Sequence, residues 1–222
     1  AMLRVLRLEP RSAALMHFVG DAAVALRDAG LALACYRRAL ALDPTRPSPR
    51  VAIARLLRER GDLLAARLEL VAALATAPGW REAVLELCEV HKAADRPAEA
   101  LTVLTRHLAN VPADLDALVM LAETLLRLSR ADDARVAVLR VLRHDPAHLH
   151  ALWLEGLLLV RQARVRDAMD RWRVVAANDQ DARMADVARS AIADLDAGAH
   201  AFAGVGAGVA DDRSTPAAAR IA

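Results

Sequence analysis

The best candidate for a metal-binding cluster in this sequence is the segment 144–150. Its three histidines, His144, His148 and His150, are separated by four and then two residues. Imidazole nitrogens spaced in this way can bind zinc or nickel. The segment also joins two predicted helices, and the sequence does not identify the groups that would orient the imidazoles. We therefore expect a solvated linker here and keep the three histidines only as weak candidates for metal ligands.

No other pattern in the sequence points to catalysis. A phosphate-binding glycine loop, a nucleophile elbow and a zinc-protease helix are all missing from it. Glu86 and Glu89 share one helix face, but arginines are close in the sequence, so ion pairs are the favoured interpretation. Cys35 and Cys88 are far apart and form no CxxC motif, and we expect them to be buried thiols. The sequence therefore predicts a protein that is not an enzyme and that needs no cofactor.

The composition of the chain indicates helices. Hydrophobic residues, mostly alanine and leucine, make up 56% of the 222 residues, and aromatic residues make up only 3%. Alanine, leucine, arginine and glutamate form helices readily, whereas sheets favour β-branched and aromatic residues. The 30 basic and 28 acidic residues leave a net charge of +2, which is too balanced for a nucleic-acid-binding surface. Because no apolar run reaches the roughly 18 residues of a membrane span, we expect neither a nucleic-acid partner nor membrane insertion.

A period of 34 residues runs through the chain. Prolines recur at this interval, a leucine stands four residues before each of them, and an alanine recurs in a constant phase. The three series are Pro10, Pro44, Pro78, Pro112 and Pro146; Leu6, Leu40, Leu74, Leu108 and Leu142; and Ala32, Ala66, Ala100, Ala134 and Ala168. A fourth series places larger side chains at Tyr36, Leu70, Leu104, Val138 and Trp172. Offsets of four and eight residues lie on one helix face, so each period ends in a helix with a constant apolar face.

Each period also contains an earlier helix, which a short polar turn separates from the later one. Leu118, Leu121, Ala122 and Leu125 show the spacing of an apolar helix face. Arg60-Gly61-Asp62 is one of the turns, and Gly30 is three residues later than the position equivalent to Gly61. The unit is thus a helix–turn–helix of 34 residues, and we expect its first copy to have a distorted or shorter turn.

This pattern resembles the tetratricopeptide repeat, a 34-residue helical pair whose second helix shows alanine, an aromatic residue and proline at fixed places. Residues 32–44 resemble that second helix closely, and Gly20 and Gly156 match the small residue of the first helix. The family's tryptophan and first tyrosine are mostly replaced by aliphatic residues. The resemblance implies an all-α, right-handed α-solenoid of five repeats, at about residues 13–46, 47–80, 81–114, 115–148 and 149–182.

The ends of such an array need cover, because each repeat buries its apolar face only against its neighbours. Residues 1–12 match the end of a second helix and its linker, so we expect either a natural half-repeat or an array that continues upstream. Residues 183–197 predict a capping helix with Val187, Ala191 and Leu195 on its inner face. Residues 198–222 are rich in alanine and glycine, and we expect a flexible tail; docking of Phe202, Val205 and Val209 in a groove is the alternative.

The resemblance also implies a peptide-binding groove, because in this family the first helices line a concave face. The corresponding residues are His17, Val51, Leu85, Val119 and Trp153, then Asp21, Arg55, Glu89, Glu123 and Leu157 one turn later, with Glu59, Arg58, Lys92, Arg127 and Arg161 beside them. An apolar stripe flanked by both signs of charge suits a peptide, and Trp153 is the best single anchor. The alternative is that Val51, Leu85 and Val119 are ordinary core residues. The family's carboxylate clamp uses lysine, asparagine and arginine, and the corresponding residues here are His17, Asp21, Ala52, Glu82 and Glu86, so we do not expect that clamp.

We therefore expect a protein–protein interaction scaffold or adaptor that binds a peptide or protein in a larger assembly of bacterial type. One alternative is a regulatory or docking arm of an enzyme whose catalytic domain lies outside this chain. Another is a structural scaffold that self-associates through an open N-terminal edge. The cellular compartment stays undetermined, with the cytoplasm favoured and the periplasm the alternative if the chain is a piece of a secreted protein.

Overall fold

The computed structural model describes residues 12–178 and 182–205, and the side chains up to residue 197. All regular elements in these ranges are helices, and they follow one another as antiparallel pairs. The pairs are α2 (Ala13–Ala25) with α3 (Ala29–Leu42), α4 (Ser48–Glu59) with α5 (Leu63–Thr76), α6 (Arg81–Ala93) with α7 (Pro97–Asn110), α8 (Leu115–Arg127) with α9 (Ala131–His144), and α10 (Leu149–Arg161) with α11 (Val165–Ala176). A longer helix, α12 (Ala182–Val205), follows. The predicted all-α fold of repeated helix pairs is confirmed.

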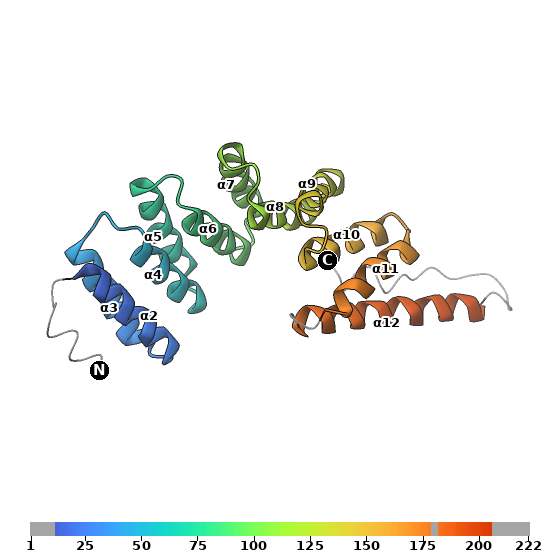
Figure 1. The fold of residues 1–222 in the computed structure, drawn as a ribbon, viewed down its shortest axis with the longest axis horizontal. Coiled ribbons are helices and arrows are strands. Elements are labelled where there is room, and N and C mark those ends of the chain that lie inside the picture. Colours follow the sequence, from blue (N-terminus) through green and yellow to red (C-terminus); the bar gives the residue numbers. More distant parts are fainter. Residues whose placement is uncertain (1–11, 179–181, 206–222) are drawn as a thin grey trace. The chain divides into compact units, whose positions relative to one another are not determined.

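The chain divides into two compact units, residues 1–112 and residues 113–222. The first unit contains α2 to α7, and the second contains α8 to α12 (Figure 1). Within each unit the two helices of a pair pack together, and the second helix of a pair also packs on the first helix of the next pair, as α3 does on α4 and α9 does on α10. Each unit is therefore a stack of helical repeats.

A left-handed residue closes the first helix of every pair. The residues with positive φ are spaced by 34, at Arg27 (59°), Gly61 (82°), Asp95 (53°), Ser129 (59°) and Ala163 (59°). The prediction of a distorted or shorter first turn is wrong, because Arg27 occupies the position of Gly61 with the same backbone conformation. Gly30 lies inside α3 instead. Four of the five positions accept a side chain in this conformation although it costs about 1–2 kcal/mol per non-glycine residue.

Backbone hydrogen bonds explain why the turns recur. After each left-handed residue, the next amide donates to the carbonyl five residues earlier, as in Asp28 to Ala23 (2.9 Å), Asp62 to Leu57 (2.9 Å) and Arg130 to Leu125 (2.8 Å). This pattern is the Schellman motif, which satisfies carbonyls at the end of a helix. The donating residue is also the N-cap of the next helix. One short motif thus ends the first helix and starts the second.

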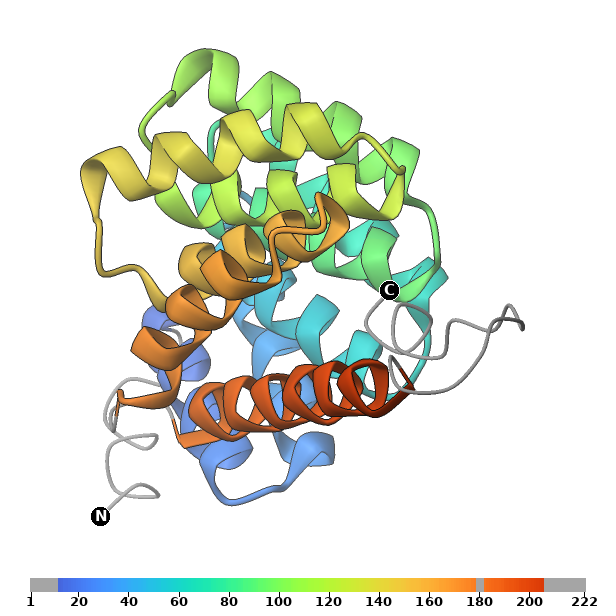
Figure 2. The ribbon, with the colours of Figure 1, turned by 90° about the vertical axis from the view of Figure 1, so that its right-hand side faces the viewer.

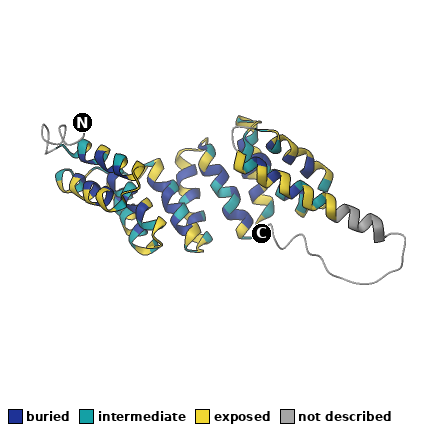
Figure 3. Cartoon of the chain, turned by 90° about the horizontal axis from the view of Figure 1, so that it is seen from below, coloured by how far each residue is buried: buried dark blue, intermediate teal, exposed yellow. Residues whose placement is uncertain are grey.

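The alanine series marks the closest helix contacts. Ala32, Ala66, Ala134 and Ala168 are fully buried and Ala100 is 2% exposed. Small side chains allow two helix axes to approach to about 8–10 Å. Figure 3 shows buried residues, in dark blue, along the helix faces that meet inside each unit. Much of the alanine in the composition is therefore core rather than surface.

The large side chains of the fourth series lie opposite the small residues of the first helices. Tyr36 and Trp172 are 2% and 0% exposed. They lie against Gly20 and Gly156, where an added Cβ atom would come within 2.4 Å of Tyr36 and 2.1 Å of Trp172. The repeats with Leu70, Leu104 and Val138 carry Ala54, Cys88 and Ala122 at the glycine position. An aromatic side chain on the second helix is thus paired with glycine on the first helix, and an aliphatic side chain is paired with alanine or cysteine.

The helix α12 packs on α11 and continues as one rod to Val205 (Figures 1 and 2). The predicted end of the capping helix at residue 197 is wrong, since residues 198–205 are helical. Its buried face contains Ala185, Ala188 and Ala191, whereas Val187 is 43% exposed. Val187 was predicted on the inner face, but a spacing of four residues drifts off a face that repeats every 3.6 residues. The half-repeat and linker predicted at residues 1–12 lie outside the described part except for Ser12, and so do the side-chain contacts of Phe202, Val205 and Val209.

Both cysteines are free and buried, as predicted. Burial raises the pKa of Cys88 to about 12, and the nearby Glu89 adds to this shift. Burial, and then Asp28, raise the pKa of Cys35. Neither thiol therefore has the lowered pKa of a reactive cysteine. Among the helices in the described ranges, none combines the length and hydropathy that crossing a bilayer requires.

Candidate functional site

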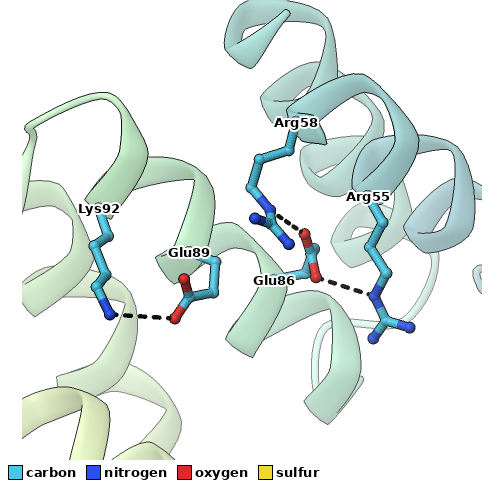
Figure 4. Close-up of polar contacts among 5 residues, drawn as sticks. All are labelled: Arg55, Arg58, Glu86, Glu89 and Lys92. Atoms are coloured by element: carbon cyan, nitrogen blue, oxygen red, sulfur yellow. Dashed lines mark hydrogen bonds and ion pairs between the residues drawn. The ribbon is translucent and has the colours of Figure 1, made fainter. Parts of the chain in front are cut away.

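A buried carboxylate joins two first helices in the first unit. Glu86 of α6 is 6% exposed, and its two oxygens accept hydrogen bonds from Nε of Arg55 (3.0 Å) and Nε of Arg58 (2.7 Å), both on α4. Figure 4 shows the two arginines, one turn apart, on either side of the carboxylate. A buried charge is tolerated when it is paired and hydrogen-bonded. The predicted ion pairing of Glu86 is confirmed, and Glu86 fixes both guanidinium groups.

Arg55 is fixed at one nitrogen and open at the others. Its side chain is 52% exposed, and the two terminal nitrogens point away from Glu86 in Figure 4. Arg58 is more enclosed, at 30% exposed, and its hydrogen bond to Glu86 raises the pKa of its guanidinium. Arg55 can therefore donate hydrogen bonds outward from a position that Glu86 has already set.

Glu89 and Lys92 continue the same surface along α6. Lys92 Nζ lies 3.8 Å from Glu89 Oε1 (Figure 4), so Glu89 forms an ion pair as predicted, but with a lysine instead of an arginine. Leu85, one turn before Glu89, is half-buried. We call Arg55, Arg58, Leu85, Glu89 and Lys92 the α4–α6 face. It combines an aliphatic side chain with charges of both signs.

The first pair contributes a second polar group to this unit. The hydroxyl of Tyr36 donates to Asp21 Oδ1 at 2.8 Å, and His17 Nε2 lies 3.8 Å from Asp21 Oδ2. The rings of His17 and Tyr36 are 5.2 Å apart. Burial, followed by the hydrogen bond to Asp21, raises the pKa of Tyr36 well above its ordinary value. Sequence reasoning placed Tyr36 in the core but missed its bond to Asp21, because hydroxyl direction depends on how α2 and α3 pack.

The structure places Val51 and Val119 in the core instead of on an open surface. Val51 is 4% exposed and belongs to the cluster around Leu70 and Leu87, and Val119 is 6% exposed. Val51 and Val119 are therefore ordinary core residues, as the alternative interpretation predicted, and they are not available to contact a partner. Leu85 differs from them because it is only half-buried.

In the second unit, α8 and α10 carry the remaining predicted residues. His150 Nε2 lies 2.6 Å from Glu123 Oε1, which links the two helices. Trp153 stacks on Trp172 with ring centres 4.8 Å apart, and its carbonyl accepts a hydrogen bond from Trp172 Nε1 at 3.1 Å. Trp153 is thus partly a core residue, packed against the cluster around Leu152. Arg127 and Arg161 are exposed.

The three histidines at 144–150 have different surroundings and do not share a contact. His148 caps α10 by accepting from the amide of Ala151 at 3.3 Å, His150 pairs with Glu123, and His144 is exposed at the end of α9. Within the described ranges, no group of three or more His, Cys, Asp or Glu side chains is placed to hold a metal ion.

The second unit also has a hollow that the sequence did not indicate. It has a volume of about 270 Å³ and lies between α9, α10 and α11. Val138, Leu158 and Leu159 contribute apolar lining, and the ion pair of Arg171 with Glu155, at 2.9 Å, belongs to its polar lining. These residues come from three helices, so no spacing along the sequence marks them as neighbours.

The comparison with known families places part of the chain in a repeat family. The model of the tetratricopeptide repeat family matches residues 91–152, which cover the end of α6 to the start of α10. No curated protein matches the chain in sequence.

Solved structures match over most of the chain. One is YrrB, described as a TPR protein with an unusual peptide-binding site (18% identity, TM-score 0.62, 86% of this chain and 98% of that one). Another is yeast Tom70 (15% identity, TM-score 0.74, 90% of this chain and 43% of that one). A third is PilW, a type IV pilus biogenesis factor (17% identity, TM-score 0.70, 84% and 86%). At these identities the likeness concerns the fold. Together with the family match and the 34-residue helical pairs, it identifies the chain as a member of the tetratricopeptide repeat proteins.

Proposed function

We propose that this chain is a non-catalytic scaffold or adaptor that binds a peptide or protein partner on the first helices of its repeats. Tetratricopeptide repeat proteins generally mediate protein interactions. In this chain the α4–α6 face offers the best-defined contact surface. The observation that carries the proposal is the fixed, outward-facing guanidinium of Arg55.

The geometry of Arg55 favours a carboxylate ligand. An arginine held by one nitrogen keeps its other donors for a planar acceptor, and arginine forms paired hydrogen bonds with carboxylates. Because Glu86 already restrains the side chain, less rotational freedom is lost on binding. The half-buried Leu85 suits an aliphatic side chain of the same ligand. The partner we propose therefore presents an acidic residue beside an aliphatic one.

Peptide selection tests this proposal without a known partner. A random peptide display library is selected against the whole chain, and the chosen peptides are measured by fluorescence anisotropy. We expect peptides that contain an acidic and an aliphatic residue. Arg55→Gln should weaken their binding about tenfold, because glutamine can still donate to Glu86 but carries no charge.

The matched control is Arg143→Gln, which removes an exposed arginine from α9. It should leave peptide binding unchanged. Circular dichroism of each variant checks that the helices are retained. Equal binding by the wild type and by Arg55→Gln would remove Arg55, and with it the α4–α6 face, from the proposed site.

Self-association through the first repeat is a second candidate, and Phe18 favours it. Phe18 lies on α2 at the position that Glu86 occupies on α6, 68 residues later. Glu86 faces the preceding first helix, α4, whereas Phe18 is 65% exposed. Sedimentation velocity over a concentration series tests this candidate. A dimer that Phe18→Ser abolishes would support it, and a monomer at all concentrations would exclude it.

A further inference from the structure

The helix α5 is apolar on the side that faces solvent as well as on the side that faces the core. Leu70 and Ala73 are fully buried, while Leu64, Leu68 and Val71 are 65%, 56% and 47% exposed. The exposed residues, followed by Ala75, recur at intervals of four and three and so form one stripe. A helix that is hydrophobic all round is normally buried. The outer face of α5 therefore has the composition of a covered surface.

The repeat itself provides the comparison. The positions of Leu64, Leu68, Val71 and Ala75 are Gly30, Ala34, Arg37 and Ala41 in α3, and Ala98, Thr102, Thr105 and Ala109 in α7. In α9 they are Asp132, Val136, Leu139 and Arg143. Of these second helices, α5 alone has aliphatic side chains at the first three positions. The repeat architecture does not require them, because the other repeats have the same fold without them.

Arginines stand in the same register on the second helices of the repeats before and after α5. Arg38 of α3 and Arg106 of α7 occupy the position of Ala72 in the repeats before and after α5. Both are exposed, as is Arg37, and none of the three forms an ion pair with a described residue. The acids of α5 and its cap are engaged, since Glu69 pairs with Arg50 at 3.0 Å and Asp62 accepts from the amide of Ala65. Glu99 is the exposed acid that α7 adds nearby. The surroundings of the stripe are thus mainly cationic.

From these features we propose that the outer face of α5 binds an amphipathic helix of a partner protein, with an apolar stripe and acidic residues on both sides of it. The stripe from Leu64 to Ala75 is about 17 Å long, which matches three turns of a partner helix. Ala72 and Ala75 are small enough to let two helices approach closely. The arginines of α3 and α7 complement acidic flanks. This site is separate from the α4–α6 face and does not depend on it.

Two synthetic peptides test the proposal on the whole chain. One is a labelled helix of about four turns with leucines on one face and glutamates on both flanks. The other has arginine in place of each glutamate. The glutamate helix should bind and the arginine helix should not. The double variant Leu64→Gln, Leu68→Gln should weaken binding by about tenfold to a hundredfold, because two half-exposed leucines lose their apolar contact.

A control variant and a charge exchange complete the design. Val136→Gln with Leu139→Gln makes the same kind of change on α9, where both side chains are exposed, and should leave binding unchanged. Arg38→Glu with Arg106→Glu should make the chain prefer the arginine helix. Because all the changed side chains are exposed, circular dichroism should show unaltered helices.

Several results would overturn the proposal. They are the absence of binding by either peptide, equal binding of both, and binding that the α5 double variant does not weaken. Two further measurements test whether a membrane surface or a second copy of the chain binds the outer face of α5 instead. Flotation with phosphatidylglycerol-containing vesicles that depends on Leu64 and Leu68, without peptide binding, would assign the face to a membrane surface. A dimer in sedimentation velocity that the same variant abolishes would assign it to a second copy of the chain.

Discussion

Gly156 lies against the indole of Trp172 so closely that a Cβ atom on Gly156 would be 2.1 Å from Nε1 of the ring. The same relation joins Gly20 to Tyr36, at 2.4 Å from Cε1. In the repeats between them, alanine or cysteine faces leucine or valine. Glycine therefore occurs in the two repeats where the facing side chain is an aromatic ring, and the packing of Trp172 depends on the missing side chain of Gly156.

This relation predicts strong coupling between the two positions. Gly156→Ala should lower the free energy of unfolding by about 2–3 kcal/mol through overpacking, and Trp172→Leu by about 3 kcal/mol through a cavity. The double variant recreates the pair Ala54 with Leu70 and should cost clearly less than the sum. Urea unfolding of the four proteins measures the coupling. Additive losses would show that the contact does not limit packing.

The left-handed turns predict opposite effects of glycine at two equivalent positions. Gly61→Ala, at φ 82°, should lower stability by about 1 kcal/mol. Ala163→Gly, at φ 59°, should raise it by about 0.5 kcal/mol, because strain is relieved but the unfolded chain gains freedom. Ala34→Gly, in the middle of α3, is the control and should cost about 1 kcal/mol. Thermal unfolding by circular dichroism ranks the three, and a loss at position 163 as large as at position 34 would contradict the strain argument.

The buried carboxylate of Glu86 should matter more for stability than its exposed neighbour. Glu86→Gln leaves two arginines with a neutral acceptor and should cost about 1–2 kcal/mol, a figure reduced because Arg55 is half-exposed. Glu89→Gln changes a side chain that is 37% exposed and should stay within about 0.5 kcal/mol. Urea midpoints of the two variants provide the comparison. Equal midpoints would mean that Glu86 does not hold α4 and α6 together.

His91 should make the stability of the protein depend on pH. Burial lowers its pKa below the ordinary 6.5, Arg67 and Arg96 lower it further, and Glu99 opposes them. The unfolded chain therefore binds the proton more readily than the folded one. Stability should be fully present above pH 6.5 and decrease as the pH falls below it, until the folded imidazole also becomes protonated.

The variant His91→Leu tests this pH dependence. Leucine occupies the equivalent positions 57, 125 and 159, so it should fit the core and flatten the dependence between about pH 7.5 and 5.5. His144→Gln, which changes an exposed histidine, should leave the slope of the wild type. Unfolding free energies at several pH values decide the matter. An unchanged slope in His91→Leu would assign the dependence to other groups.

The period of the sequence determined the helical pairs because their causes are local. Alanine at contact positions, apolar residues at helical spacing and prolines after the second helices act within a few turns of one helix. The same locality explains the error at the first turn. Glycine often indicates a residue in the left-handed backbone conformation. The Schellman hydrogen bonds nevertheless form at Arg27, although that position carries no glycine.

Only the tertiary structure decided which side chains meet across helices and which remain exposed. Val51 and Leu85 occupy equivalent positions in the sequence, yet Val51 is buried and Leu85 is half-buried. Glu86 accepts from two arginines that are 28 and 31 residues earlier, and α5 leaves three aliphatic side chains exposed on its outer face. The spacing of residues places a side chain on a face of its own helix. Whether a neighbouring helix covers that face depends on how the helices pack, and the spacing of residues along one helix does not determine that packing.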